Sequence, residues 1–110
     1  MSSITAIEVL AEPTRRQILD LLRDGERSVG DLVDDMRVTQ PAVSKHLRVL
    51  RDSGLVDVRV DAQRRLYRIR PEPLIELDAW LATYRGLWTE SLDRLEQHLD
   101  KKASQRKGQR

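Results

Sequence analysis

The chain has 110 residues, no Cys, and 20 Lys and Arg against 18 Asp and Glu, a net charge of +2. This length fits one domain with a modest core, and the absence of Cys excludes disulfides and thiolate metal sites. No apolar run is long enough to cross a membrane, and the N-terminus lacks the pattern of a signal peptide, so we expect a cytoplasmic protein. The small net charge does not itself indicate nucleic acid, so the distribution of basic residues matters more.

Two short helices are predicted at the start of the chain. Ile4 and Ile7 mark the first, which is too short to be stable alone and must pack on another surface. Pro13 begins the second, because a residue without an N–H is tolerated in a first helical turn. Arg15 and Arg16 lie in that turn, and we interpret them as solvent-exposed, with phosphate contact as the alternative.

The next two helices have clear start and stop signals. Ser28 is predicted to cap a third helix, with Asp31 in its first turn, where a carboxylate is favoured. Thr39 is predicted to cap a fourth helix over about residues 40–53, and Gly54 ends it where a left-handed residue is favoured. The apolar stripe of this fourth helix consists of Val43, Leu47 and Leu50.

The opposite face of the fourth helix is polar and basic. Side chains of these types hydrogen-bond base edges and phosphates, and a recognition helix presents them to the major groove. Two short helices joined by a tight turn are typical of a helix-turn-helix. The alternative is a solvated face that is basic by chance. The candidate DNA-binding residues on this helix are Thr39, Gln40, Ser44, Lys45, His46 and Arg48. His46 lies beside the apolar stripe, so packing is the alternative to phosphate contact for this residue.

After the fourth helix the apolar residues alternate, which predicts a β-hairpin over about residues 55–70. The turn contains no Gly, so we expect a loop of more than two residues. Arg64 and Arg65 flank this loop and are the remaining candidate DNA-binding residues. A hairpin directly after a recognition helix is typical of a wing whose arginines enter the minor groove or hold phosphates. The alternative is an ordinary solvated hairpin.

One long helix is predicted from Leu74 to Leu99, followed by a disordered basic tail over residues 100–110. The first 99 residues would then form one DNA-binding and dimerisation domain. The apolar residues of the long helix repeat every seven positions, which favours pairing with a second copy over folding back on the same domain. The candidate dimerisation residues are Ile4 and Ile7 together with Leu77, Leu81, Tyr84, Trp88, Leu92 and Leu95.

Several runs of the sequence resemble ArsR/SmtB-type bacterial regulators. P-T-R-R-Q-I-L-D-L-L from Pro13 resembles their second helix, and Q-P-A-V-S-K-H-L-R-V-L-R-D-S-G-L-V from Gln40 resembles their recognition helix and following strand. R-R-L-Y-R-I from Arg64 is similar to their wing. The resemblance implies a mainly α fold with a small β-hairpin, a winged helix-turn-helix that is homodimeric through its terminal helices. By position it assigns DNA contact to Gln40, Ser44 and Lys45.

The metal ligands of that family's sensors are absent from this chain. The third helix reads D-L-V-D-D-M from Asp31, without a thiol, and the last helix has only His98, followed three residues later by Lys101. The sequence W-L-x-x-Y-R-x-x-W from Trp80 resembles a subset of the family without metal sites. We therefore expect neither a metal nor another cofactor.

The sequence predicts a DNA-binding transcriptional regulator, most simply a repressor. Its partners would be a second copy and double-stranded DNA carrying an imperfect inverted repeat. An effector between the long helices would contact Trp80, Tyr84 and Trp88, although this spacing is more typical of a core. The alternative function is a winged-helix protein-interaction module without DNA binding. The sequence contains no nucleophile–base set or Gly-rich phosphate loop, so we do not expect an enzyme.

Overall fold

In a computed structural model that describes residues 3–108, and side chains from Thr5 to Ala103, the chain forms six helices and one two-stranded sheet. The prediction of a mainly helical fold with one hairpin is confirmed. The chain divides into two compact units, residues 1–77 and 78–110. The elements are α1 (Ser3–Leu10), α2 (Pro13–Leu22), α3 (Val29–Met36), α4 (Gln40–Asp52), β1 (Val56–Asp61), β2 (Arg64–Ile69), α5 (Glu72–Ala82) and α6 (Arg85–Gly108).

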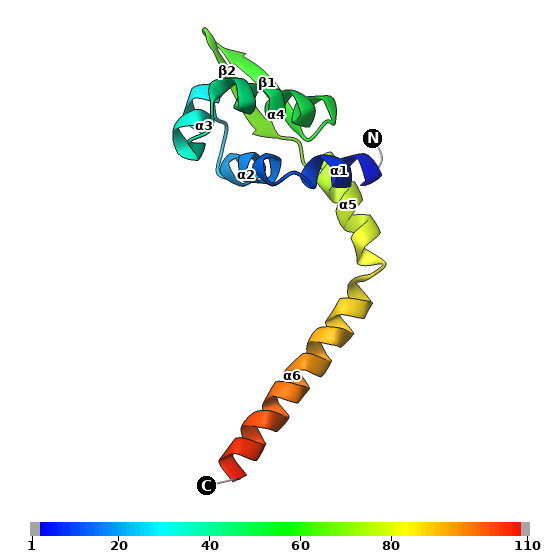
Figure 1. The fold of residues 1–110 in the computed structure, drawn as a ribbon. Coiled ribbons are helices and arrows are strands. Elements are labelled where there is room, and N and C mark those ends of the chain that lie inside the picture. The colour runs from blue at the N-terminus through cyan, green and yellow to red at the C-terminus, as the bar shows by residue number, and fades with distance from the viewer. Residues whose placement is uncertain (1–2, 109–110) are drawn as a thin grey trace. The chain divides into compact units, whose positions relative to one another are not determined.

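The first unit has an aliphatic core built around α4. Figure 1 shows α4 alongside the hairpin, and α4 also contacts α2 and α3. Burial of a large aliphatic side chain stabilises a fold by roughly 1.5–3 kcal/mol, so this core fixes the rotation of α4 about its own axis. Its buried members are Val9, Ile18, Leu19, Leu22, Leu32, Met36, Val43, Leu47, Leu50, Leu55 and Val56.

The predicted helix caps are confirmed. The Ser28 hydroxyl accepts a hydrogen bond from the Asp31 N–H at 3.2 Å, and the Asp31 carboxylate accepts one from the Ser28 N–H at 3.1 Å. This reciprocal pair is a capping box. The Thr39 hydroxyl accepts from the Ala42 N–H at 3.4 Å, and Gly54 follows α4 with a φ of 76°. These local interactions define both helices of the helix-turn-helix.

The hairpin turn is tighter than the sequence predicted. Asp61 pairs with Arg64 across the antiparallel sheet, so only Ala62 and Gln63 connect the strands. The prediction of a longer loop was wrong because Ala62 adopts a φ of 56°, a left-handed conformation that two-residue turns use and that Gly adopts at lower cost. The tip of the hairpin projects beyond the helices of the first unit (Figure 1).

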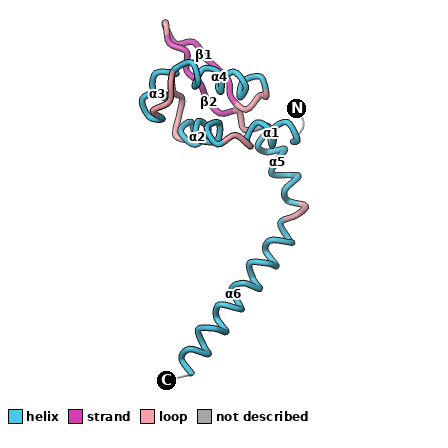
Figure 2. The backbone as a smooth tube through the Cα atoms, viewed as in Figure 1, coloured by secondary structure: helices cyan, strands magenta, loops and turns pink. Residues whose placement is uncertain are grey.

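The long terminal helix predicted over residues 74–99 is interrupted. Thr83 and Tyr84 form a loop between α5 and α6 (Figure 2). The Thr83 hydroxyl donates to the Trp80 carbonyl at 2.7 Å, and the Tyr84 N–H donates to the carbonyl of Leu81, three residues back, at 2.9 Å. Backbone bonds to carbonyls three residues back replace the α-helical bonds at Thr83 and Tyr84, and the Thr83 hydroxyl stabilises this turn, which the apolar spacing does not reveal.

The end of α6 also differs from the prediction. The helix continues to Gly108, so residues 100–108 are helical where a disordered tail was predicted, and residues 109–110 lie outside the described part. Lys, Ala, Gln and Arg dominate this stretch and are strong helix formers, which explains the difference. None of the described helices combines the length and apolar character needed to span a membrane.

Candidate DNA-binding and dimerisation surfaces

The polar face of α4 points into solvent. Val43 and Leu47 are at most 1% exposed, which holds the helix in one orientation. Apart from His46, the residues at this helix that the sequence assigned to DNA contact therefore lie on its outer side. Those that are exposed are Thr39, Gln40, Ser44, Lys45 and Arg48. Thr39 in addition caps the helix, so its hydroxyl already has a hydrogen-bond partner.

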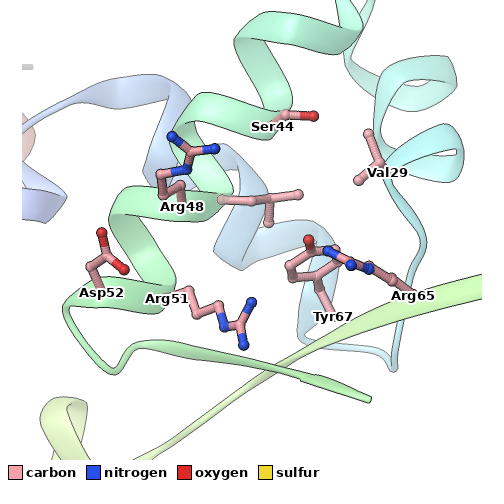
Figure 3. A pocket seen from close by; sticks show the side chains of 8 residues that line it. Val29, Ser44, Arg48, Arg51, Asp52, Arg65 and Tyr67 are labelled. Atoms are coloured by element: carbon pink, nitrogen blue, oxygen red, sulfur yellow. The ribbon is translucent and has the colours of Figure 1, made fainter. Parts of the chain in front are cut away.

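A pocket of about 440 Å³ lies between α4, β2 and the start of α3. Ser44 and Arg48 of α4 line it together with Arg65 of β2, so the structure brings together three predicted site residues from two segments (Figure 3). Arg51 lines the same pocket and was not among the predicted residues. Its signal was present in the sequence, since positions 44, 48 and 51 fall on one helical face.

The base of the wing is held by backbone hydrogen bonds. The Arg27 N–H donates to the Tyr67 carbonyl at 3.1 Å, and the Tyr67 N–H donates to the Arg27 carbonyl at 2.8 Å. The Arg27 side chain donates to the Leu21 carbonyl at 2.9 Å and lies 3.3 Å from the Asp35 carboxylate. β2 is therefore fixed against the segment that leads into α3, and the side chains of the wing extend from a rigid base.

Arg64 does not line the pocket. Its guanidinium lies 3.4 Å from the Asp31 carboxylate at the start of α3. Hydrogen bonds from the Ser28 backbone and hydroxyl, followed by the positive charges of Arg64 and Arg27, hold the pKa of Asp31 below its usual value despite partial desolvation. Neighbouring residues in a strand point to opposite faces, which is why Arg64 and Arg65 have different surroundings.

His46 lies on another side of α4, half-buried against the connection between α1 and α2. Its Nδ1 accepts a hydrogen bond from Arg15 Nε at 3.3 Å and lies 3.9 Å from the Glu12 carboxylate. Arg15 also donates to the Val9 carbonyl at 3.2 Å. Desolvation acts to raise the pKa of Glu12, but hydrogen bonds from the Arg15 backbone N–H and from Thr14 outweigh it, so the net shift of this pKa is downward.

Arg15 and Arg16 are therefore not simply solvated. Arg16 donates to the Leu10 carbonyl at 2.9 Å, so both arginines satisfy carbonyl groups at the end of α1. Sequence reasoning missed this role, because periodicity gives no indication of which carbonyl a long side chain will reach.

The apolar residues assigned to dimerisation are largely uncovered. Trp88 is 44% exposed, Leu92 61% and Leu95 53%, and they lie on one side of α6 at spacings of four and three. Ile7 and Tyr84 are exposed as well, Leu77 and Leu81 are half-buried, and the Ile4 side chain lies outside the described residues. The Tyr84 ring packs edge-on against Trp80, with centroids 5.2 Å apart.

A helix-turn-helix with a basic, outward-facing second helix and an adjacent hairpin defines a winged helix-turn-helix protein. Residues 12–58 match the model of the family described as bacterial regulatory protein, arsR family. This match, together with the relatives described next, shows that the chain belongs to this family. It is a DNA-binding transcriptional regulator and not an enzyme.

Known relatives are similar over most of the chain. The HTH-type transcriptional regulator Rv2034 of Mycobacterium tuberculosis is 39% identical over 95 residues, which cover 86% of each chain. The transcriptional repressor SdpR of Bacillus subtilis is 27% identical over 77 residues, 70% of this chain and 86% of that protein. A crystal structure described as a possible transcriptional regulator for arsenical resistance is 41% identical in sequence, with a TM-score of 0.66. The match covers 84% of this chain and 93% of the chain in that structure.

Proposed function

We propose that the protein is a homodimeric repressor that reads an imperfect inverted repeat through α4. The observation that supports this most directly is the exposed polar face of α4 opposite a fully buried stripe. Gln40, Ser44 and Lys45 lie in the N-terminal half of the helix, the part that enters a major groove in helix-turn-helix complexes. Gln, Ser and Lys side chains reach both base edges and phosphates. We place the protein in the cytoplasm, where bacterial DNA lies.

The uncovered apolar side of α6 supports a dimer. Trp88, Leu92, Leu95 and Leu99 follow the four–three–four spacing of a helix that pairs with another helix, and each is at least 44% exposed in the single chain. A second copy is the simplest partner, because a two-fold axis presents two α4 helices to successive major grooves. Two half-sites related by that axis make the operator an inverted repeat.

The proposal is tested by a mobility shift with duplex DNA from upstream of the protein's own gene. Lys45→Ala and Arg48→Ala are expected to weaken binding by about tenfold, since each removes a contact to a charged or base-edge group. Arg23→Ala is the control, because Arg23 is exposed at the end of α2, outside the polar face of α4. Binding that Lys45→Ala and Arg48→Ala leave unchanged would overturn this assignment of the recognition helix.

Two further measurements test the rest of the proposal. Light scattering after size exclusion gives the mass, and a monomer at micromolar concentration would contradict the dimer. A transcriptional reporter distinguishes repression, in which expression rises when the gene is deleted, from activation, in which it falls. A folded dimer that binds no duplex would support a protein-interaction module instead.

A further inference from the structure

Three arginines line the pocket between α4 and β2. Arg48 and Arg51 extend from one face of α4, and Arg65 extends from β2 (Figure 3). Ser44 and Tyr67 complete its polar lining apart from one carboxylate, that of Asp52. Three guanidinium groups against one carboxylate leave an excess of two positive charges around a space open to solvent.

The hairpin arginines that lie outside this pocket are paired with carboxylates. Arg59 lies 2.9 Å from Glu26, Arg64 lies 3.4 Å from Asp31, and Arg68 lies 3.4 Å from Asp57. Within the described part of the chain, none of the ion pairs involves the arginines of the pocket, which are Arg48, Arg51 and Arg65. Folding neutralises most of the wing's positive charge and leaves this pocket available to an anion.

We propose that the pocket holds one phosphate of the DNA backbone, with Arg51 and Arg65 as its main ligands. This inference rests on the proposed function. When α4 lies in a major groove and the wing in the adjacent minor groove, the strand that separates the two grooves passes between them. The planar guanidinium carries paired N–H donors that match a phosphate, and Arg48 and the Ser44 hydroxyl supply further donors at the edge of the pocket.

The geometry of the wing suits a fixed phosphate contact. Tyr67 is tied through both backbone groups to Arg27, so β2 does not need to become ordered when DNA binds. Arg65 and Tyr67 point to the same face of β2, toward α4, whereas Arg64 points to the opposite face and pairs with Asp31. The contact is to backbone, so it contributes affinity and register but no sequence preference.

Arg64 and Arg65 offer a matched pair for the test. Fluorescence anisotropy measures binding to a random-sequence duplex of about three helical turns, over a series of salt concentrations. Arg51→Gln and Arg65→Gln are each expected to weaken binding on the order of tenfold. Each variant should also reduce the slope of log affinity against log salt by about one per protomer. Arg64→Gln should reduce both quantities clearly less, because the Arg64 guanidinium is already paired with the Asp31 carboxylate.

Circular dichroism and thermal melting confirm that each variant is folded before its binding is compared. If Arg51→Gln and Arg65→Gln keep the affinity and salt slope of Arg64→Gln, the phosphate pocket is wrong while the DNA-binding function stands. If the unchanged protein binds neither this duplex nor its own upstream DNA, the proposed function fails, and the phosphate pocket fails with it.

Discussion

The guanidinium of Arg64 in β2 lies 3.4 Å from the carboxylate of Asp31 in α3. The same carboxylate accepts the N–H of Ser28 and so caps α3. One acidic side chain therefore caps the start of the first helix of the helix-turn-helix and also pairs with Arg64 at the start of the second wing strand. The wing and the helices that position α4 are linked through this group.

Replacing Asp31 with Asn is expected to make stability less dependent on acidic pH. Hydrogen bonds from Ser28, and then the charges of Arg64 and Arg27, lower the pKa of Asp31 in the folded state. A carboxylate with a depressed pKa stabilises the fold fully above its unfolded pKa, near 4, and loses this contribution as pH falls through the folded value. Urea unfolding between about pH 6 and pH 2 should show a shallower decline in the free energy of unfolding for the Asn variant.

The control for that experiment is Asp34→Asn, on the exposed side of the same helix. It should keep the pH dependence of the unchanged protein. If the two variants lose stability in parallel as the solution is acidified, Asp31 does not provide the linkage.

Thr39→Ala is expected to lower the free energy of unfolding by about 1 kcal/mol, because the Ala42 N–H loses its cap. The first turn of α4 also carries Gln40, so a frayed start should weaken DNA binding as well. Thr39→Ser keeps a hydroxyl and should restore both properties. Denaturant titration and a mobility shift measure them, and equal stability of the Ala and Ser variants would show that the cap has no energetic role.

Ala62→Gly is expected to stabilise the protein by up to about 1 kcal/mol. Ala62 holds a φ of 56° in the hairpin turn, a conformation that strains a residue with a Cβ and that Gly adopts freely. Ala62→Val should destabilise it, since a β-branched side chain is still less suited to a positive φ. Thermal melting compares the three proteins, and the same midpoint for Gly and Val would contradict a strained turn.

Local signals in the sequence were sufficient to predict much of the fold. The bounds of α4 followed from the Thr39 cap, the Gly54 end and the stripe between them, and alternation identified the hairpin. The turn could not be predicted, because its length depends on one Ala accepting an unfavourable φ. The break before α6 was missed for a similar reason, since the bond from Thr83 to the Trp80 carbonyl leaves the apolar periodicity unchanged.

The site was less predictable than the fold, because its members depend on contacts between distant segments. Alternation shows that Arg64 and Arg65 face opposite ways, but it does not show which of them meets Asp31, 33 residues away from Arg64. The same limit applies to His46, whose partner Arg15 is separated from it by 31 residues. Helical spacing placed His46 beside the apolar stripe of the fourth helix, but it did not decide between packing and phosphate contact.

Arg15→Gln is expected to destabilise the first unit by about 1–2 kcal/mol, because it removes partly buried hydrogen bonds to the Val9 carbonyl and to His46. Arg16→Gln is the matched control, since Arg16 makes one exposed hydrogen bond to a neighbouring carbonyl, and its cost should be smaller. Chemical denaturation measures both. Equal costs for the two variants would mean that the contact with His46 contributes nothing to the packing of α4.

Replacing Leu92 and Leu95 together with Ser is expected to give a folded monomer. Both side chains are more than half exposed in the single chain and lie on one side of α6, so their removal affects association rather than a core. Glu90→Ser with Gln97→Ser, also exposed on α6, is the control and should remain dimeric. Sedimentation equilibrium measures the mass. A monomer places one α4 at a time on DNA, so affinity for an inverted repeat should fall by about a hundredfold or more. Under the proposed dimer, a double Leu variant with the same mass as the unchanged protein would place the interface elsewhere on the chain.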